Sequence, residues 1–382
     1  MVTWKIPLYK VYWEEDDVEA VTKIIKRGMY WAVGPEIEEF EKIVSQYVGT
    51  KYAVAFNSGT SALHATMIAI DLKPGEEVIT PSFTFIATCN APLFVRARPV
   101  FADIEEETFG LDPASVLEKI GPKTRAVMPI HYGGMPCKHI EELRKICEEK
   151  GLILIEDAAE SLGARINGKP VGSFGHAAIL SFCGNKVITT GEGGMVLTNS
   201  GEMYEKLKLI RSHGRLETEP YFLTTKTLDY VTLGFNWRIP TIVAALGISQ
   251  MRKLDKVIEM RRKNADYLTN RLKSIEDIII PHEPPGFFCV YQMYTIRVKN
   301  GLRDKLREHL AKKQIMSKVY FEPAHLTYFY KNILRYSDHL PVTEKVSKEV
   351  LTLPLYPTMT KDELDYIVES IKEFFESNLQ KS

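Results

Sequence analysis

The hydrophobic positions of this 382-residue chain switch repeatedly between helical and strand spacing. Residues 35–47 place Ile37, Phe40 and Val44 on one face of a helix that Pro35 is suited to start. Short apolar runs with strand character follow at residues 52–56, 77–80, 99–103, 125–130, 152–155, 177–182 and 195–198. Amphipathic helices separate several of these runs. The alternation predicts an α/β fold in which helices flank a mostly parallel mixed sheet.

The pattern changes near residue 252. A long charged helix is predicted to run through residue 273, followed by a strand at 290–298, a helix at 302–312 and a last helix from 361. The charges between Lys253 and Lys263 are typical of a solvated helix face. We therefore predict a large domain at residues 1–251 and a smaller α+β domain at residues 252–382. The sequence has no long flexible linker, so the two domains should pack closely.

Composition narrows the range of functions. The 49 basic and 49 acidic side chains balance, so the chain lacks the excess positive charge that binds nucleic acid or an anionic membrane. It has no apolar run long enough to span a membrane and no signal-like start. The five cysteines are widely spaced, with no Cys-x-x-Cys pair, which disfavours a metal site and a disulfide framework. These features predict a cytoplasmic protein without a metal centre.

The first candidate for chemistry is Lys186, which stands in a compact loop that contains glycines but no other cation. Apolar runs with strand character at 179–182 and 195–197 flank this loop and should carry Lys186 inward. Burial disfavours the ammonium form of a lysine and leaves a nucleophilic amine. Lysines that form a Schiff base are commonly presented in this way. A solvated loop lysine is the alternative if this stretch is considered alone.

Carboxylates follow the apolar run at 153–155. Asp157 lies directly after Glu156, and Glu160 comes three residues later. Acids at the carboxyl end of a strand face the ligand crevice of an open α/β sheet. Pyridoxal phosphate requires a carboxylate beside its ring nitrogen, and Asp157 is placed to supply it. In the alternative, Asp157 caps the next helix and Glu160 complements the dipole of that helix.

Residues 52–64 predict a strand that passes through a turn of small residues into a helix. The N-terminus of a helix offers free amides to an anion. Gly59 allows a close approach of the backbone, and the hydroxyls of Ser58 and Thr60 add donors for a phosphate. The same residues also make good N-caps without any ligand. Ser181, five residues before Lys186, is a further candidate phosphate donor.

Taken together and in this order, the turn, the aspartate and the loop lysine resemble the fold-type I pyridoxal-phosphate enzymes. The chain is most similar to the nucleotide-sugar aminotransferases of the DegT/DnrJ/StrS type. The motifs that carry this resemblance cover nearly the whole chain, at residues 57–63, 80–88, 156–160, 191–195, 234–238, 320–325 and 353–357. The resemblance implies the fold-type I architecture and pyridoxal 5'-phosphate as the cofactor.

The resemblance also implies roles for individual residues. Lys186 would hold the cofactor covalently and act as general base and general acid. Phe85 would stack on the cofactor ring, with Phe83 as the competing candidate. Asn236 would reach the phosphate of the neighbouring subunit, unless it caps the helix that begins near Pro240. The active unit would then be a homodimer with shared sites, and a tetramer stays open.

Glutamate would donate the amino group, and a nucleotide-linked keto-sugar would receive it, in a ping-pong sequence. Glu160 is expected near the cofactor hydroxyl. A glutamate at this position, together with residues 184–186, makes the chain resemble the perosamine synthases. Those enzymes aminate a 4-keto-6-deoxymannose carried on GDP, and a thymidine- or uridine-linked sugar is the close alternative. His131 and His325 are each left open between a place in or near the site and a structural role.

Two other classes of function share this scaffold. A pyridoxal-dependent sugar dehydratase is disfavoured, because such relatives replace the loop lysine with histidine. A non-catalytic regulatory or binding protein would have an unreactive cofactor pocket. A Rossmann dehydrogenase is also disfavoured, because no Gly-x-Gly-x-x-Gly turn directly follows a predicted strand.

Overall fold

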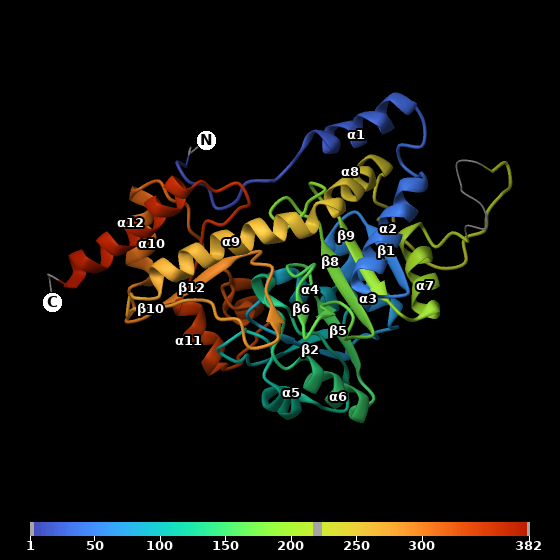
Figure 1. Ribbon diagram of the computed structural model, residues 1–382. Coiled ribbons are helices and arrows are strands. Elements are labelled where there is room, and N and C mark those ends of the chain that lie inside the picture. Colours follow the sequence, from blue (N-terminus) through green and yellow to red (C-terminus); the bar gives the residue numbers. More distant parts are fainter. Residues whose placement is uncertain (1–3, 217–223, 380–382) are drawn as a thin grey trace.

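The computed structural model describes residues 4–216 and 224–379 and is built around a seven-stranded sheet (Figure 1). Its strands lie side by side in the order β1 (Tyr52–Phe56), β9 (Gly194–Thr198), β8 (Ala177–Ser181), β5 (Ile153–Asp157), β4 (Thr124–Val127), β2 (Glu77–Pro81) and β3 (Arg98–Ala102). Strand β9 runs antiparallel to both of its neighbours, and the other pairs are parallel. The predicted mostly parallel mixed sheet is therefore confirmed, and six strands end at the same edge.

Helices cover both faces of this sheet, which explains why its strands are continuous apolar runs. Successive residues of β8 point to opposite faces, with Ala178 and Leu180 in one core and Ala177 and Ile179 in another. One face is covered by α2 (Pro35–Val48), α5 (Pro113–Lys119), α6 (Ile140–Lys150) and α8 (Thr241–Arg252). The other is covered by α3 (Gly59–Ala69), α4 (Ile86–Phe94) and α7 (Gly201–Arg211).

The C-terminal part of the chain forms a second sheet, which is antiparallel and has the strand order β10 (Ile278–Ile279), β12 (Tyr294–Val298) and β13 (Val350–Leu353). Its core packs Tyr294 of β12 against Leu268 and Ile367. The helices here are α9 (Leu254–Leu272), α10 (Arg303–Lys312), α11 (Pro341–Glu349) and α12 (Lys361–Leu379), with short helical turns η2 (Ala324–Leu326) and η3 (Phe329–Ile333). Figure 1 shows α9 running from α8 toward β10, β12, α10 and α12.

A third, small sheet connects distant parts of the sequence. It pairs β11 (Phe287–Phe288) with β6 (Arg165–Ile166), and β6 with β7 (Lys169–Pro170). The predicted strand at 290–298 begins later, at Tyr294. The reason is that the amides of Val290 and Met293 donate instead to Gly134 and Gly133. These glycines belong to the helical turn η1 (Tyr132–Gly134), which is thereby held beside the edge of the large sheet.

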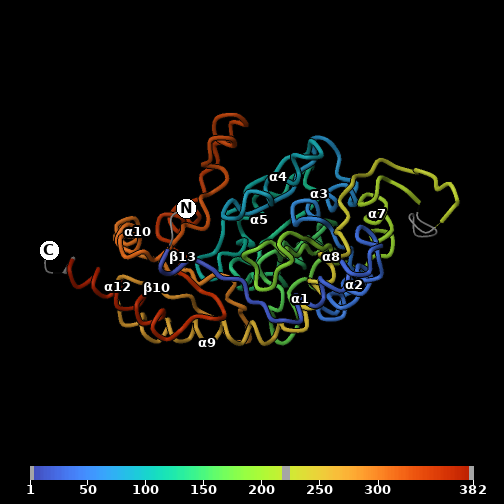
Figure 2. The backbone as a smooth tube through the Cα atoms, turned by 90° about the horizontal axis from the view of Figure 1, so that it is seen from above, coloured from blue at the N-terminus to red at the C-terminus, as the bar shows by residue number. Residues whose placement is uncertain are grey.

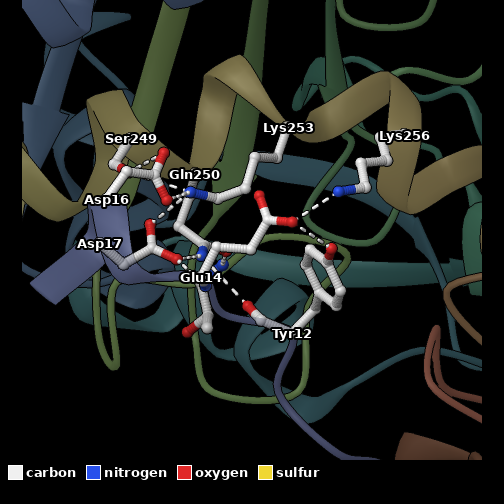
Figure 3. Close-up of polar contacts among 9 residues, drawn as sticks. Tyr12, Glu14, Asp16, Asp17, Ser249, Gln250, Lys253 and Lys256 are labelled. Atoms are coloured by element: carbon white, nitrogen blue, oxygen red, sulfur yellow. Dashed lines mark hydrogen bonds and ion pairs between the residues drawn. The ribbon is translucent and has the colours of Figure 1, made fainter.

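The prediction of a solvated helix face at 253–263 is wrong at Lys253 and Arg261, whose side chains are buried. Lys253 Nζ lies 2.5 Å from Asp16 Oδ1 and 2.9 Å from Asp17 Oδ1, both in α1 (Glu15–Arg27) (Figure 3). Arg261 donates to three backbone oxygens, two of them in residues 291 and 292. Buried charges of this kind are tolerated because each one finds partners that replace water.

The first described residues form an extended segment that runs from beside the β10–β12–β13 sheet to α1 (Figure 2). The Ile6 amide donates to the Gln314 oxygen, and Ile6 pairs with Ile315. The amide of Leu355 donates to the oxygen of Leu8. The cluster around Lys253 then fixes the other end of the segment. Leu8 and Tyr9 of this segment reach the cavity described below.

Candidate functional site

The carboxyl-end edge of the seven-stranded sheet borders a cavity of about 520 Å³. Its wall is formed by the segments that follow β1, β2, β4, β5 and β8, by the N-terminal segment, by Met293 and by residues from the stretch 316–321. Eight of the nine predicted site residues line it, namely Ser58, Gly59, Thr60, Phe85, Asp157, Glu160, Ser181 and Lys186. The ninth, Asn236, lies outside this wall. Tertiary structure therefore brings candidates from four separate motifs into one space.

Lys186 lies in the loop between β8 and β9, which starts and ends at this edge of the sheet. The hydroxyl of Thr189 donates to the oxygen of Phe182 at 3.0 Å and closes the loop. Gln292 lies just before β12, and its Nε2 donates to the oxygen of Asn185 at 2.9 Å. The side chain of Lys186 is only 14% exposed. Lys186 is therefore not a solvated surface lysine.

Glu160 contacts both the lysine and the neighbouring turn. Its Oε1 lies 3.5 Å from Lys186 Nζ, and its Oε2 accepts the amide of Gly133 at 2.9 Å. Gly133 adopts the left-handed conformation, with φ of 61°. Residues 158–164 form turns rather than a helix, so the helix-cap and helix-dipole alternatives for Asp157 and Glu160 are wrong. The contact between Glu160 and Lys186 places a carboxylate beside the lysine amine that would carry a proton during the reaction.

Asp157 ends β5 and is almost completely buried. Burial raises the pKa of its carboxyl, and the hydroxyl of Thr88, which donates to Oδ2 at 2.7 Å, opposes that rise. The amide of Ala159 donates to Oδ1 at 3.2 Å. A protonated ring nitrogen next to this carboxylate would offset the desolvation of its charge. Asp157 therefore fits the partner that the nitrogen of pyridoxal phosphate requires.

The turn between β1 and α3 joins a strand to a helix, as the sequence predicted. Ser58 is the N-cap of α3, and its Oγ accepts the amide of Ser61 at 3.1 Å. The first amides of a helix have no intrahelical acceptor, so they are available to an anion. A Cβ atom on Gly59 would lie 3.2 Å from the Cβ of Ser181, so the turn and the end of β8 are in contact. This arrangement fits a phosphate group held between Ser181 and the helix N-terminus.

The two phenylalanines after β2 have different environments. Phe83 is fully buried and stacks on Tyr132, with 5.2 Å between the ring centroids. Phe85 precedes α4, is 58% exposed and lines the cavity. Phe85 thus stays the candidate for contact with the cofactor ring, whereas Phe83 belongs to the core.

The two histidines left open by the sequence are both buried and hydrogen bonded. His131 lines the cavity, and its Nδ1 accepts the amide of Cys137 at 2.9 Å. Its Nε2 must therefore carry the proton, which it donates to Glu156 Oε2 at 3.0 Å. His325 Nδ1 lies 2.7 Å from Ser82 Oγ. The contact between Ser82 and His325 ties the segment before Phe85 to η2.

Asn236 is exposed, and its backbone pairs with Ser212. It does not cap α8, whose N-cap is Pro240. Its predicted role toward another subunit stays a prediction.

Sequence reasoning missed four residues of the site. Gly194 has to be a glycine, because a Cβ atom there would lie 2.2 Å from the oxygen of Ser58. Thr88 holds Asp157, and its position four residues after Thr84 at the start of a helix was the available signal. Lys318 and Tyr320 line the cavity from the C-terminal part of the chain, where no local pattern marks them.

Among residues 4–216 and 224–379, no group of three or more potential metal ligands occurs. In the same ranges, no helix is both long enough and apolar enough to cross a membrane. All five cysteines are free thiols.

The fold and the cavity together define a fold-type I enzyme that uses pyridoxal phosphate. The chain belongs to the DegT/DnrJ/EryC1/StrS aminotransferase family, whose model matches residues 12–372. It is 35% identical over 346 residues to the GDP-perosamine synthase of Caulobacter vibrioides, an alignment that covers 90% of this chain and 91% of that protein.

Solved structures agree with this assignment. PseC of Helicobacter pylori, an aminotransferase involved in the biosynthesis of pseudoaminic acid, superposes with a TM-score of 0.91 at 27% identity, over 97% of this chain and 99% of that one. Spr1654 of Streptococcus pneumoniae in its PLP form gives a TM-score of 0.91 at 26% identity, with the same coverage of 97% and 99%. The protein is a PLP-dependent sugar aminotransferase, and the resemblance inferred from its motifs is confirmed.

Proposed function

We propose that this chain transfers the amino group of glutamate to a nucleoside-diphosphate-linked 4-keto-6-deoxy sugar, in the manner of a perosamine synthase. The observation that carries the proposal is the single cavity in which Lys186, Asp157 and the turn at Ser58 converge. Relatives named GDP-perosamine synthase, at 33–35% identity, support a sugar of this class.

Bound pyridoxal phosphate supplies an electron sink that stabilises negative charge on the reacting carbon. The buried carboxylate of Asp157 would keep the ring nitrogen protonated, and the turn at 58–60 with Ser181 would hold the phosphate. Lys186 Nζ would take a proton from the substrate carbon and return it to the cofactor carbon. Glu160, whose Oε1 lies 3.5 Å from that nitrogen, would stabilise the ammonium form while Lys186 carries the proton.

The cavity wall has few cations for such anionic substrates. Among the described residues that line it, the lysines are Lys186 and Lys318, and none is an arginine. Lys318 is exposed, and its Nζ lies 4.7 Å from the ring centroid of Tyr320. We assign Lys318 to an anionic group of the substrate, either the diphosphate or a carboxylate of glutamate. We propose that a second subunit supplies further positive groups.

A homodimer with shared sites is therefore part of the proposal. Asn236 is exposed and lies outside its own cavity, which suits a residue that serves another subunit. Large side chains near the N-terminus, including Tyr9, Trp13 and Trp31, are also exposed. A subunit interface that includes these side chains would remove their apolar surface from water.

Mixed dimers test the sharing. Chains with Lys186→Ala and chains with Asn236→Ala would each be nearly inactive alone. If Asn236 serves the partner's site, a mixed dimer has one doubly altered and one intact site, so a 1:1 mixture should regain about a quarter of full activity. If Asn236 serves its own site, the mixture should show no regain.

Two further assignments rest on the sequence. We propose that the boundary between the domains lies at residues 251–252, near the end of α8, because α8 packs on the large sheet and α9 leads to the β10–β12–β13 sheet. A cytoplasmic location is proposed from the free, widely spaced cysteines.

The direct test of the proposed function is the visible absorption spectrum of the purified protein with pyridoxal phosphate. A band from cofactor bound to Lys186 should bleach on addition of glutamate and return with a keto-sugar nucleotide. The Lys186→Ala variant should lack the band. If glutamate does not bleach the band in the unaltered protein, the proposal that glutamate donates the amino group fails.

The runner-up functions predict other outcomes. A dehydratase would give a deoxygenated sugar instead of an amino sugar, which mass spectrometry of the product separates. A regulatory protein on the same scaffold would bind sugar nucleotides without turnover. Lys186, present where dehydratase relatives have histidine, favours the aminotransferase.

A further inference from the structure

A second hollow adjoins the cavity. It encloses about 580 Å³ and shares Thr84, Phe85 and Phe321 with the cavity wall. Its remaining lining comes from Ile86, Asn90, Glu322, Thr327, Tyr328 and Phe329. We call this hollow the side groove. Because the two spaces share one wall, a molecule that extends from the cavity can continue into the side groove.

The side groove exposes several aromatic rings. Phe85 is 58%, Tyr328 73% and Phe329 46% exposed. These side chains come from the N-terminus of α4 and from the start of η3, which are far apart in sequence. A planar heterocycle stacks well on such rings, and stacking of this kind tolerates any base.

Two polar groups of the side groove differ in hydrogen-bonding character. Glu322 is exposed, and its carboxylate makes no hydrogen bond or ion pair with residues 4–216 or 224–379. Asn90 Oδ1 accepts the hydroxyl of Tyr330 at 2.9 Å, so its Nδ2 is left to donate. The side groove therefore offers a negatively charged acceptor and an amide donor beside aromatic surface.

We propose that the side groove binds the nucleobase of the sugar nucleotide and that Glu322 selects guanine. The inference rests on the proposed function, since it requires a nucleotide-linked substrate. Guanine has two adjacent donors, N1–H and the N2 amino group, which match the two oxygens of a carboxylate, and its O6 accepts from an amide such as that of Asn90. Uracil and thymine have one N–H between two carbonyl oxygens, and those oxygens would face the negative charge of Glu322.

The experiment measures binding of GDP, inosine diphosphate, UDP and dTDP to the PLP-loaded protein by calorimetry. Inosine diphosphate lacks only the N2 amino group of GDP. The unaltered protein should bind GDP most tightly. In Glu322→Gln, GDP affinity should fall roughly 10- to 100-fold, the range expected for losing a bidentate contact to a base. The difference between GDP and inosine diphosphate should shrink, and UDP affinity should not fall, because an amide can pair with uracil.

Two further variants make the result specific. Glu308→Gln removes another exposed carboxylate, in α10, and should leave all four affinities unchanged. Phe329→Ala should weaken all four nucleotides by similar factors, because stacking does not depend on the base. The inference is overturned if Glu322→Gln leaves GDP binding unchanged, if it weakens GDP and UDP equally, or if the unaltered protein prefers UDP or dTDP. Bleaching by glutamate, measured on the unaltered protein, decides the proposed function separately.

Discussion

The contact between Thr88 and Asp157 gives a sharp test of the site. Thr88→Val keeps the shape of the side chain but removes the hydroxyl that donates to Asp157 Oδ2 at 2.7 Å. Thr88 is also bonded to Thr84, so the substitution leaves a second hydroxyl to find another partner. The lost bond to a buried charged group corresponds to about 1.5–3 kcal/mol of stabilisation of the ionised carboxylate.

The sign of the effect follows from the direction of the pKa shift. Burial already raises the pKa of Asp157, and Thr88 opposes this rise. Removing Thr88's donor should raise the pKa further, so Asp157 becomes protonated at a higher pH. In a plot of the rate of the glutamate half-reaction against pH, the acid limb should then move toward neutral pH.

The assay is the rate of bleaching by glutamate, measured across pH with pyridoxal phosphate at saturation. Thr88→Ser, which retains a hydroxyl, should leave the acid limb near its original position. The reasoning is refuted if Thr88→Val and Thr88→Ser give the same acid limb, since the loss of the donor would then have no effect on Asp157.

Three more predictions follow from particular contacts. Gly194→Ala should weaken cofactor binding at least about tenfold by equilibrium titration, because the new Cβ would lie 2.2 Å from the oxygen of Ser58 and must displace the turn at 58–60, which we propose holds the phosphate. Lys253→Ala should lower the free energy of unfolding in urea by about 3–5 kcal/mol, because it leaves the buried carboxylate of Asp17 without its cation. Lys256→Ala removes an exposed ion pair with Glu14 (Figure 3) and should leave the free energy of unfolding nearly unchanged. Phe85→Ala should weaken cofactor binding while stability changes little, since this ring is already 58% exposed.

Matched controls separate these effects from general damage. Gly121→Ala adds a Cβ where no atom lies within 4 Å and should leave cofactor binding intact. Phe83→Ala empties a fully buried position and should cost about 3–5 kcal/mol of stability. Equal losses of cofactor affinity in the Gly121 and Gly194 variants, or equal losses of stability at Lys253 and Lys256, would contradict the structural reasoning.

The sequence predicted features that depend on neighbouring residues. Strand and helix periodicity identified the main elements, and the small residues at 58–60 indicated the turn into α3 because N-cap chemistry is local. The prediction was less accurate where a partner lies far along the chain. Lys253 was expected in solvent, and its burial depends on Asp16 and Asp17, more than two hundred residues away.

By itself, the sequence determined the types of residue needed for the chemistry and the elements that carry them: a lysine in a loop, an aspartate at a strand end and a turn of small residues. Only the tertiary structure decided which of them meet and what surrounds them. It brought Lys186 beside Glu160 and gave Asp157 a hydrogen bond from Thr88. It also placed Gly194 in close contact with Ser58. Of the two phenylalanines, it buried Phe83 and exposed Phe85 at the cavity. The physical reason is that these contacts join different strand ends, and the order of strands in the sheet, which brings those ends together, is fixed by packing across the whole chain.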